Sequence, residues 1–182
     1  MAQSKVLVDT NTYLRLAKTI HPLLAEPFGD LPYCLYIIPE LNRELGNKRL
    51  RSKFPWIDEP EFQANRQQFP QLSRQQSKAI EQTFDFIWAH ALSEFPGPSK
   101  VDVRYLATAY ELVVPVVTDD LDMQALAKEF DISTLSTIEL LAMMHEAGHI
   151  SLKVVDGLMA YWEYENDVPA KMKKDYKRLF KG

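Results

Sequence analysis

The sequence has a single cysteine, Cys34, among 182 residues, so no disulfide can form within the chain. No apolar run approaches the ~20 residues that a membrane-spanning helix needs. The N-terminus leads from Met1 into an apolar segment without the hydrophobic region and cleavage site of a secretory signal peptide. Internal repeats and low-complexity segments are absent as well. We therefore expect a cytoplasmic protein that is not associated with a membrane.

The chain is long enough for one domain, and its 46% hydrophobic residues suffice for an ordinary core. Its net charge of −4 hides an asymmetry. Removing a C-terminal group of six basic residues and one acid from totals of 21 and 25 leaves 15 basic and 24 acidic residues elsewhere. Such basic runs are most often solvated helix faces, but they can also contact phosphates. The C-terminal group is Lys171, Lys173, Lys174, Lys177, Arg178 and Lys181, and a second is Lys48, Arg49, Arg51 and Lys53.

A short apolar run, 113–117, is followed within five residues by three carboxylates, Asp119, Asp120 and Asp122. The run predicts a buried strand of a parallel sheet that begins at Pro115, because proline cannot donate to the sheet. Apolar residues at helical spacing follow over 123–130 and predict an amphipathic helix. One interpretation is structural: Asp119 or Asp120 caps this helix and Asp122 complements its dipole.

Similar patterns predict further strands and helices along the chain. Residues 5–8 form a strand that closes on Asp9, and Thr10 or Asn11 then caps a helix. Further strands are expected at 35–38 and within 131–135, and the segment 54–69 is irregular. Further helices are expected after Pro39, over 73–92, from Ser99 onward, and over 137–147, 151–164 and 169–180. Alternating strands and helices predict an α/β fold with a parallel sheet.

Carboxylates lie where these elements meet. In a parallel sheet the carboxyl ends of the strands gather along one edge, which would bring Asp9 and Asp120 together. Asp102 and Glu44 come from helix starts near this edge, and Glu40 competes with Glu44. Acids gathered in one place repel one another unless a cation is bound. Oxygen ligands without His or Cys favour Mg²⁺ or Mn²⁺ over zinc, and such ions serve phosphoryl chemistry.

Between residues 5 and 147 the chain resembles the PIN-domain nucleases. The resemblance is carried by four short motifs: Val8-Asp9-Thr10-Asn11, Glu44-Leu45, Asp102 with Leu106-Ala107-Thr108-Ala109, and Val117-Thr118-Asp119-Asp120-Leu121-Asp122. It implies a three-layer α/β/α sandwich with about five parallel strands and a metal-dependent endoribonuclease site. The acids of that site would be Asp9, Glu44, Asp102, Asp120 and Asp122. Of these, Asp9, Asp102 and Asp120 would hold Mg²⁺ or Mn²⁺, with Asn11 and Thr118 supporting them.

The same resemblance divides the chain into a nuclease domain, 1–147, and a C-terminal helical extension, 148–182, packed on that domain. The nuclease domain would carry a helical insertion around 54–95. The substrate would be RNA, with its backbone on Lys48, Arg49, Arg51 and Lys53 and on the C-terminal lysines as a second track. Because compact bacterial members include VapC-like toxins of toxin–antitoxin pairs, an antitoxin protein and a second copy of the chain are candidate partners. The RNA target, the antitoxin and the oligomeric state stay open.

Two other functions compete with this interpretation. His145-Glu146-Ala147-Gly148-His149 matches the H-E-x-x-H pattern of zinc metalloproteases, which requires both histidines on one continuous helix. Glycine after a helix end explains the same run without metal, and we expect Gly148 to end a helix before Ser151 caps the next. The other alternative is a PIN-like fold without catalysis that serves as a scaffold for RNA or protein.

Overall fold

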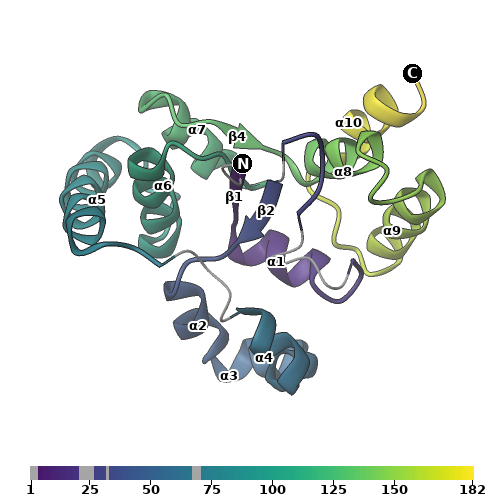
Figure 1. The fold of residues 1–182 in the computed structure, drawn as a ribbon, viewed down its shortest axis with the longest axis horizontal. Coiled ribbons are helices and arrows are strands. Elements are labelled where there is room, and N and C mark those ends of the chain that lie inside the picture. The colour runs from purple at the N-terminus through teal and green to yellow at the C-terminus, as the bar shows by residue number, and fades with distance from the viewer. Residues whose placement is uncertain (1–3, 21–26, 32, 67–70) are drawn as a thin grey trace.

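The computed structural model describes residues 4–20, 27–31, 33–66 and 71–182, and its centre is a parallel β-sheet (Figure 1). The strands β1 (Ser4–Val8), β2 (Tyr33–Tyr36), β3 (Val116–Val117) and β4 (Thr134–Leu135) lie in the order β2-β1-β3-β4. Leu7 of β1 is paired with Tyr36 on one side and Val116 on the other. The α/β class and the parallel sheet agree with the sequence prediction. The described residues form four strands, against about five expected.

Helices occupy most of the remaining described chain. Before β3 they are α1 (Thr10–Leu16), α2 (Glu40–Leu45), α3 (Lys48–Lys53), the 3₁₀ helix η1 (Pro55–Asp58), α4 (Pro60–Arg66), α5 (Arg74–Glu94) and α6 (Lys100–Leu112). Between β3 and β4 lies α7 (Leu121–Glu129). After β4 come α8 (Thr137–Glu146), α9 (Leu152–Tyr164) and α10 (Met172–Phe180). None of the described helices is both long and apolar enough to cross a membrane.

Two apolar cores cover the two faces of the sheet, as the alternation of side chains along β1 dictates. Leu7 packs with Val116 and with helices α5, α6 and α7 in one core. Val6 and Val8 point the opposite way into a second core, which includes α1, α2 and α8. Helices therefore lie on both sides of the sheet, and the arrangement is compatible with three α/β/α layers (Figure 1).

The C-terminal helices α9 and α10 belong to the second core. Val155 and Trp162 of α9 and Met172 of α10 are buried in the same apolar cluster as Val6 and Val8. In Figure 1 these helices lie beside α8, on the side of the sheet away from α5 and α6. The segment 148–182 thus shares its core with the first strand.

Two local predictions in the first part of the chain were wrong. The N-cap of α1 is Asp9 rather than Thr10 or Asn11. Strand β2 lies at 33–36 rather than 35–38; Ile37 and Ile38 are buried beyond the last pairing, and burial alone does not distinguish a strand from a buried connection.

The segment 54–66, expected to be irregular, is largely helical. Pro55 and Pro60 are the first residues of η1 and α4, positions where proline is tolerated because its missing N–H is not needed. Burial of Trp56, Ile57 and Phe62 stabilises these short helices through tertiary packing. The rest of the expected irregular segment, 67–69, lies outside the described residues.

Candidate active site

Asp9 and Asp120 are positioned by neighbouring strands and by the helices that follow them. Asp9 directly follows β1, and its Oδ1 accepts a hydrogen bond from the Thr12 backbone N–H at 2.7 Å. Asp120 follows β3, and its Oδ1 accepts from the Met123 N–H at 2.9 Å. Each aspartate is therefore the N-cap of its helix, as the structural interpretation of Asp120 expects. The capping bonds fix both carboxylates at the carboxyl edge of the sheet.

Asp102 is held by the capping box at the start of α6. The Ser99 N–H donates to Asp102 Oδ2 at 2.7 Å, and the Asp102 N–H donates to Ser99 Oγ at 3.2 Å. This is the box predicted from the sequence, with aspartate at the third helical position. The carboxylate is half-buried and cannot swing freely without breaking the box.

Glu44 and Glu40 have different surroundings, although both lie on α2. The Thr10 hydroxyl donates a hydrogen bond to Glu44 Oε2, which ties Glu44 to the residue after Asp9. Glu40 Oε1 instead lies 3.6 Å from Nε of Arg104 on α6. Glu44 is therefore the glutamate that faces the other acids.

Burial and mutual repulsion raise the pKa values of three of these acids. Burial raises the pKa of Asp9 to about 6, although hydrogen bonds from Thr118 and Thr12 lower it. Burial is also the main reason why the pKa of Glu44 is raised, and the charge of Asp102 adds to it. The pKa of Asp102 is raised by burial and then by the charge of Asp120. The charge of Asp102 thus acts on Glu44, and the charge of Asp120 acts on Asp102.

The two residues expected to support the acids differ in position. Thr118 is fully buried; its hydroxyl accepts from the Asp120 N–H at 3.1 Å and hydrogen-bonds the Asp9 carboxyl. It therefore connects the two capping aspartates. Asn11 is exposed on α1, and no hydrogen bond or ion pair joins its side chain to the part of the chain that the structure describes.

Asp122, the fifth predicted acid, is exposed in the first turn of α7 and lies against Gly97. A Cβ added to Gly97 would lie 2.2 Å from Asp122 Oδ2, far inside van der Waals contact. Glycine at this position lets Asp122 approach the connection that leads into α6 and Asp102. A larger residue at 97 would push the Asp122 carboxylate away.

The acids are of the ligand type that a hard divalent cation prefers, but they lie too far apart to coordinate one ion together. All are carboxylates, with Asp120 and Asp122 both at the start of α7 and the others on separate elements. A bound cation would relieve the repulsion that contributes to the raised pKa values of Glu44 and Asp102. However, among the described His, Cys, Asp and Glu side chains, no group of three lies close enough to hold one metal ion. The capping hydrogen bonds hold the acids near one edge without converging them on a point.

Sequence reasoning missed a buried ion pair next to these acids. Arg15 Nη1 donates to Asp119 Oδ2 at 2.8 Å, and both side chains are at most 10% exposed. Asp119 also accepts hydrogen bonds from the backbone N–H and hydroxyl of Thr137 at the start of α8. Asp119 is thus a structural residue. The sequence gives no local signal for this pair, because the residues on the same helix face as Arg15, among them Asn11 and Lys18, are polar.

Tyr105 was also missed. It is fully buried on α6, three residues after Asp102, so both residues lie on one side of that helix. Burial raises its pKa well above the usual value, and the charges of Asp9 and Glu44 raise it further. The phenol therefore stays protonated beneath the acids.

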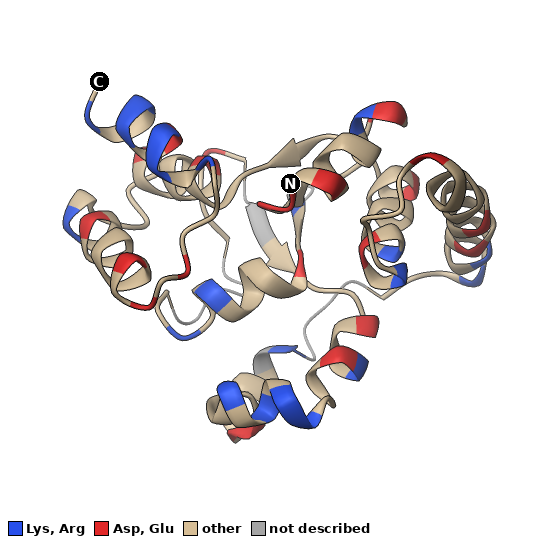
Figure 2. Cartoon of the chain, turned by 180° about the vertical axis from the view of Figure 1, so that it is seen from behind, with Lys and Arg blue, Asp and Glu red and all other residues tan. Residues whose placement is uncertain are grey.

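The predicted RNA-binding residues lie together on α3, immediately after α2 and Glu44. Lys48, Arg49, Arg51 and Lys53 are all exposed, and Figure 2 shows the basic colour concentrated on this short helix. Arg51 is partly engaged, with Nε 3.6 Å from Asp58 and 3.2 Å from the Leu45 carbonyl oxygen. The helix presents a basic surface beside the acidic site.

The histidines of the H-E-x-x-H run do not share a helix. Helix α8 ends at Glu146, and Gly148 has a φ of +71°, the left-handed conformation that ends a helix. His145 Nδ1 lies 3.0 Å from the Ile150 carbonyl oxygen, and the His149 ring packs near Phe28. Ser151 caps α9, as expected. This geometry lacks the continuous helix that the zinc motif requires.

No model of a known protein family matches the chain, and no curated protein matches its sequence. We therefore base the functional assignment on the residues of the site and their surroundings.

Proposed function

We propose that the protein is a metal-dependent endoribonuclease that hydrolyses RNA phosphodiester bonds with Mg²⁺ or Mn²⁺. The observation that supports this most is the set of carboxylates from separate elements at the carboxyl edge of the sheet, where the charge of Asp102 acts on Glu44 and that of Asp120 acts on Asp102. Open α/β sheets bind their ligands at this edge. The resemblance of the acidic motifs to PIN-domain nucleases supports the same function.

Each acid has a distinct proposed role. Asp9, Asp102 and Asp120 would hold the ion, and Thr118 connects Asp9 and Asp120 through its hydrogen bonds to both residues. When bound, the ion would polarise the phosphate and lower the pKa of the attacking water. Glu44 and Asp122 would orient that water, and burial, which raises the pKa of Glu44, makes this carboxylate a stronger base toward it. No covalent intermediate is required.

RNA cleavage tests this proposal directly. We expect the wild-type protein to cleave single-stranded RNA with Mg²⁺ or Mn²⁺, and expect EDTA or Asp120→Asn to abolish cleavage. Asp85→Asn, which removes an exposed acid on α5 away from the site, serves as the matched control and should keep full activity. Cleavage that survives both EDTA and Asp120→Asn would refute the mechanism.

Metal binding can be measured separately by calorimetry with Mn²⁺. The wild-type protein should bind Mn²⁺ and Asp9→Asn should bind it much more weakly. Because the pKa of Asp9 is about 6, protons compete with the metal and affinity should fall as the pH is lowered through 6. Equal binding by the two proteins would remove Asp9 from the metal site.

The basic helix α3 is the proposed RNA track. Replacing Lys48 and Arg49 by glutamine should weaken RNA binding and reduce its salt dependence, because each phosphate contact on single-stranded RNA contributes a slope of about −0.7. Lys78→Gln with Lys128→Gln, which removes two exposed charges on other helices, is the control. An unchanged salt slope in the α3 variant would exclude this track.

A non-catalytic RNA or protein scaffold is the second candidate. Two observations favour it. Within the described chain no three acids are spaced to hold an ion. Asp9 and Asp120 already serve as N-caps, and Asp102 belongs to the capping box of Ser99. RNA binding by the wild-type protein without cleavage under any divalent metal would support the scaffold over the nuclease.

A role as the toxin of a toxin–antitoxin pair is our biological proposal, resting on the resemblance to VapC-like proteins. Expression of the wild-type chain should then arrest bacterial growth, whereas Asp120→Asn should not. Co-expression of a cognate antitoxin should restore growth. Arrest by both proteins would separate toxicity from the acidic site.

A further inference from the structure

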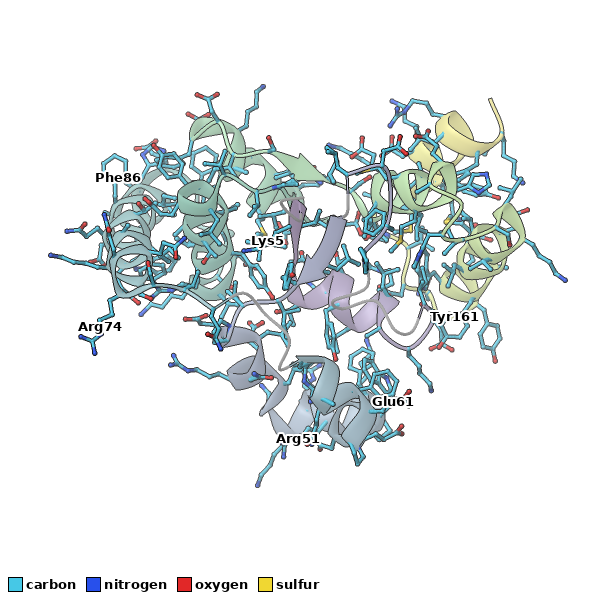
Figure 3. All side chains as sticks on the ribbon, viewed as in Figure 1. Lys5, Arg51, Glu61, Arg74, Phe86 and Tyr161 are labelled. Atoms are coloured by element: carbon cyan, nitrogen blue, oxygen red, sulfur yellow. The ribbon has the colours of Figure 1, made fainter. Side chains whose placement is uncertain are left out.

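A cleft of about 280 Å³ lies between three elements that are distant in the sequence. Its walls come from α1, from the end of α3 with η1, and from the end of α9. Figure 3 shows Tyr161 at the end of α9 on the side of the helices that follow α2. Lys53, predicted for RNA binding, lines the cleft, so the cleft continues the basic surface of α3.

Aromatic rings form much of the wall. Tyr161 is 46% exposed and can be reached by a ligand. Phe54 is half-buried with Lys53 Nζ 5.1 Å from its ring centroid, so a ligand reaches this ring when Lys53 turns toward a phosphate. Behind them Trp56 is buried and held by ring contacts, with its centroid 6.2 Å from Phe54 and 4.7 Å from Phe62. A fixed wall with accessible rings is suited to a planar ligand.

An unpartnered donor belongs to the same wall. Trp162 lines the cleft and is 1% exposed, and its indole Nε1 has no hydrogen-bond partner. Leaving a buried N–H without an acceptor is unfavourable, and such groups call for an explanation in a native protein. A ligand carbonyl in the cleft would supply the acceptor once the indole turns its N–H toward the cleft.

The charges of the cleft are mixed. Arg15 is occupied by Asp119 and Asp167, but neither Lys18 nor Lys53 forms an ion pair with a described residue. Glu59 and Glu165 also line the cleft, so a simple anion would meet repulsion as well as attraction. The mixture favours a ligand with one phosphate and a ring carrying both donors and acceptors.

We propose that this cleft binds one nucleotide of single-stranded RNA. The base packs on Tyr161 and Phe54 with a carbonyl toward the Trp162 indole N–H, and Lys18 and Lys53 take the phosphate. The identity of the ligand rests on the proposed RNA substrate. The site itself is separate from the acids and requires no metal, and the same walls could accept a free nucleotide.

Indole resonances in ¹⁵N-labelled full-length protein provide the first test, carried out in EDTA. The chain has three tryptophans, and Trp162→Phe identifies the resonance of Trp162. We expect a short single-stranded RNA to shift the Trp162 resonance saturably and at lower concentration than any 5′-mononucleotide. Trp88, which stacks on Phe84 of α5 in the opposite core, should not move. No shift with RNA, or saturation by mononucleotides alone, would overturn the proposal.

A matched pair of variants provides the second test. Tyr161→Ala should weaken binding of the RNA about tenfold, because base stacking on one aromatic side chain has roughly this effect. Tyr164→Ala removes an 85% exposed tyrosine from the same helix that does not line the cleft, and should bind as wild type. Equal binding by both variants would contradict the assignment.

Because these experiments measure binding without metal, their outcome is independent of cleavage. If RNA shifts the Trp162 resonance but the protein never cleaves RNA, the nuclease proposal is refuted and the cleft proposal stands. If the wild-type protein cleaves RNA but Tyr161→Ala binds RNA as tightly as the wild type, the nuclease proposal stands and the cleft proposal is refuted.

Discussion

The Asp9 carboxyl is 3% exposed, and burial outweighs the hydrogen bonds that would keep it ionised. Its pKa of about 6 in the folded protein compares with about 3.9 in an unfolded chain. Between these values the folded state binds the extra proton, so the contribution of Asp9 to stability is fully present below pH 4 and is lost as the pH rises through 6. The two-unit difference corresponds to about 3 kcal/mol that is lost at neutral pH.

Asp9→Asn should therefore stabilise the protein at pH 7. Asparagine keeps the N-cap of α1 but carries no charge to bury, so the variant should lose the decline in stability between pH 4 and 6. Urea unfolding at several pH values measures this, with an expected gain of up to about 3 kcal/mol at pH 7. Asp120→Asn, an exposed N-cap, is the control and should retain the wild-type profile. A destabilised Asp9→Asn at pH 7 would show that the charge is compensated in the folded protein.

The two glutamates of α2 allow a second test of single residues. Glu44→Gln should abolish RNA cleavage, because Glu44 faces Asp102 and is the proposed proton acceptor. Glu40→Gln removes only a 3.6 Å ion pair with Arg104 and should keep nearly full activity with slightly reduced stability. Initial cleavage rates of the two variants at saturating Mg²⁺ show which glutamate is catalytic. Loss of activity in Glu40→Gln alone would assign the catalytic role to Glu40 instead of Glu44.

At the scale of helices and strands, features set by near neighbours could be predicted from the sequence. The Ser99 capping box, the β3 strand and the end of α8 before Gly148 all depend on residues within a few positions. The extent of β2 could not, because pairing with β1 decides it. Nor could the helices after Phe54, which depend on where Trp56 and Phe62 are buried.

For the site, the sequence predicts which elements bring acids to one edge but not how each acid is used. Asp9, Asp102 and Asp120 do lie at helix starts, since those positions follow from strand and cap patterns. The prediction that Glu44 also comes from a helix start was wrong, because Glu44 lies in the last turn of α2. The pairing of Asp119 with Arg15 could not be predicted, because 104 positions separate the two residues. The same holds for the spacing of the carboxylates, which depends on how α2 and α6 pack against the sheet.

Two capping boxes in this chain form a natural comparison. Ser99→Ala on α6 and Ser73→Ala on α5 each remove one cap and should each cost about 1 kcal/mol of stability. Only Ser99 holds a site carboxylate, Asp102, so only Ser99→Ala should also weaken Mn²⁺ binding and cleavage. Chemical denaturation and calorimetry on both variants provide the measurement. If the two variants lose activity equally, the hydrogen bonds of Ser99 do not hold Asp102 in the position that metal binding and cleavage need.

At the scale of the whole molecule, the C-terminal helices are joined to the candidate site. Arg15 connects Asp119, next to the acids, with Asp167 in the connection between α9 and α10. Arg178 of α10 lies 3.6 Å from Glu139 of α8, and Tyr176 hydrogen-bonds Asp156 of α9. The cleft proposed for a nucleotide also uses α9. The extension thus takes part in both the core and the surface around the site.

A chain that ends at residue 147 should therefore fail to fold. It would lose the burial of Val155, Leu158, Met159, Trp162 and Met172, which share one core with β1. At about 1.5–3 kcal/mol for each buried side chain, the loss is about 10 kcal/mol, comparable with the total stability of a small domain. Circular dichroism with thermal unfolding measures this, and a chain that lacks only the exposed Lys181 and Gly182 is the control. Cooperative unfolding of 1–147 together with Mn²⁺ binding would instead establish the nuclease region as an independent domain with an accessory extension.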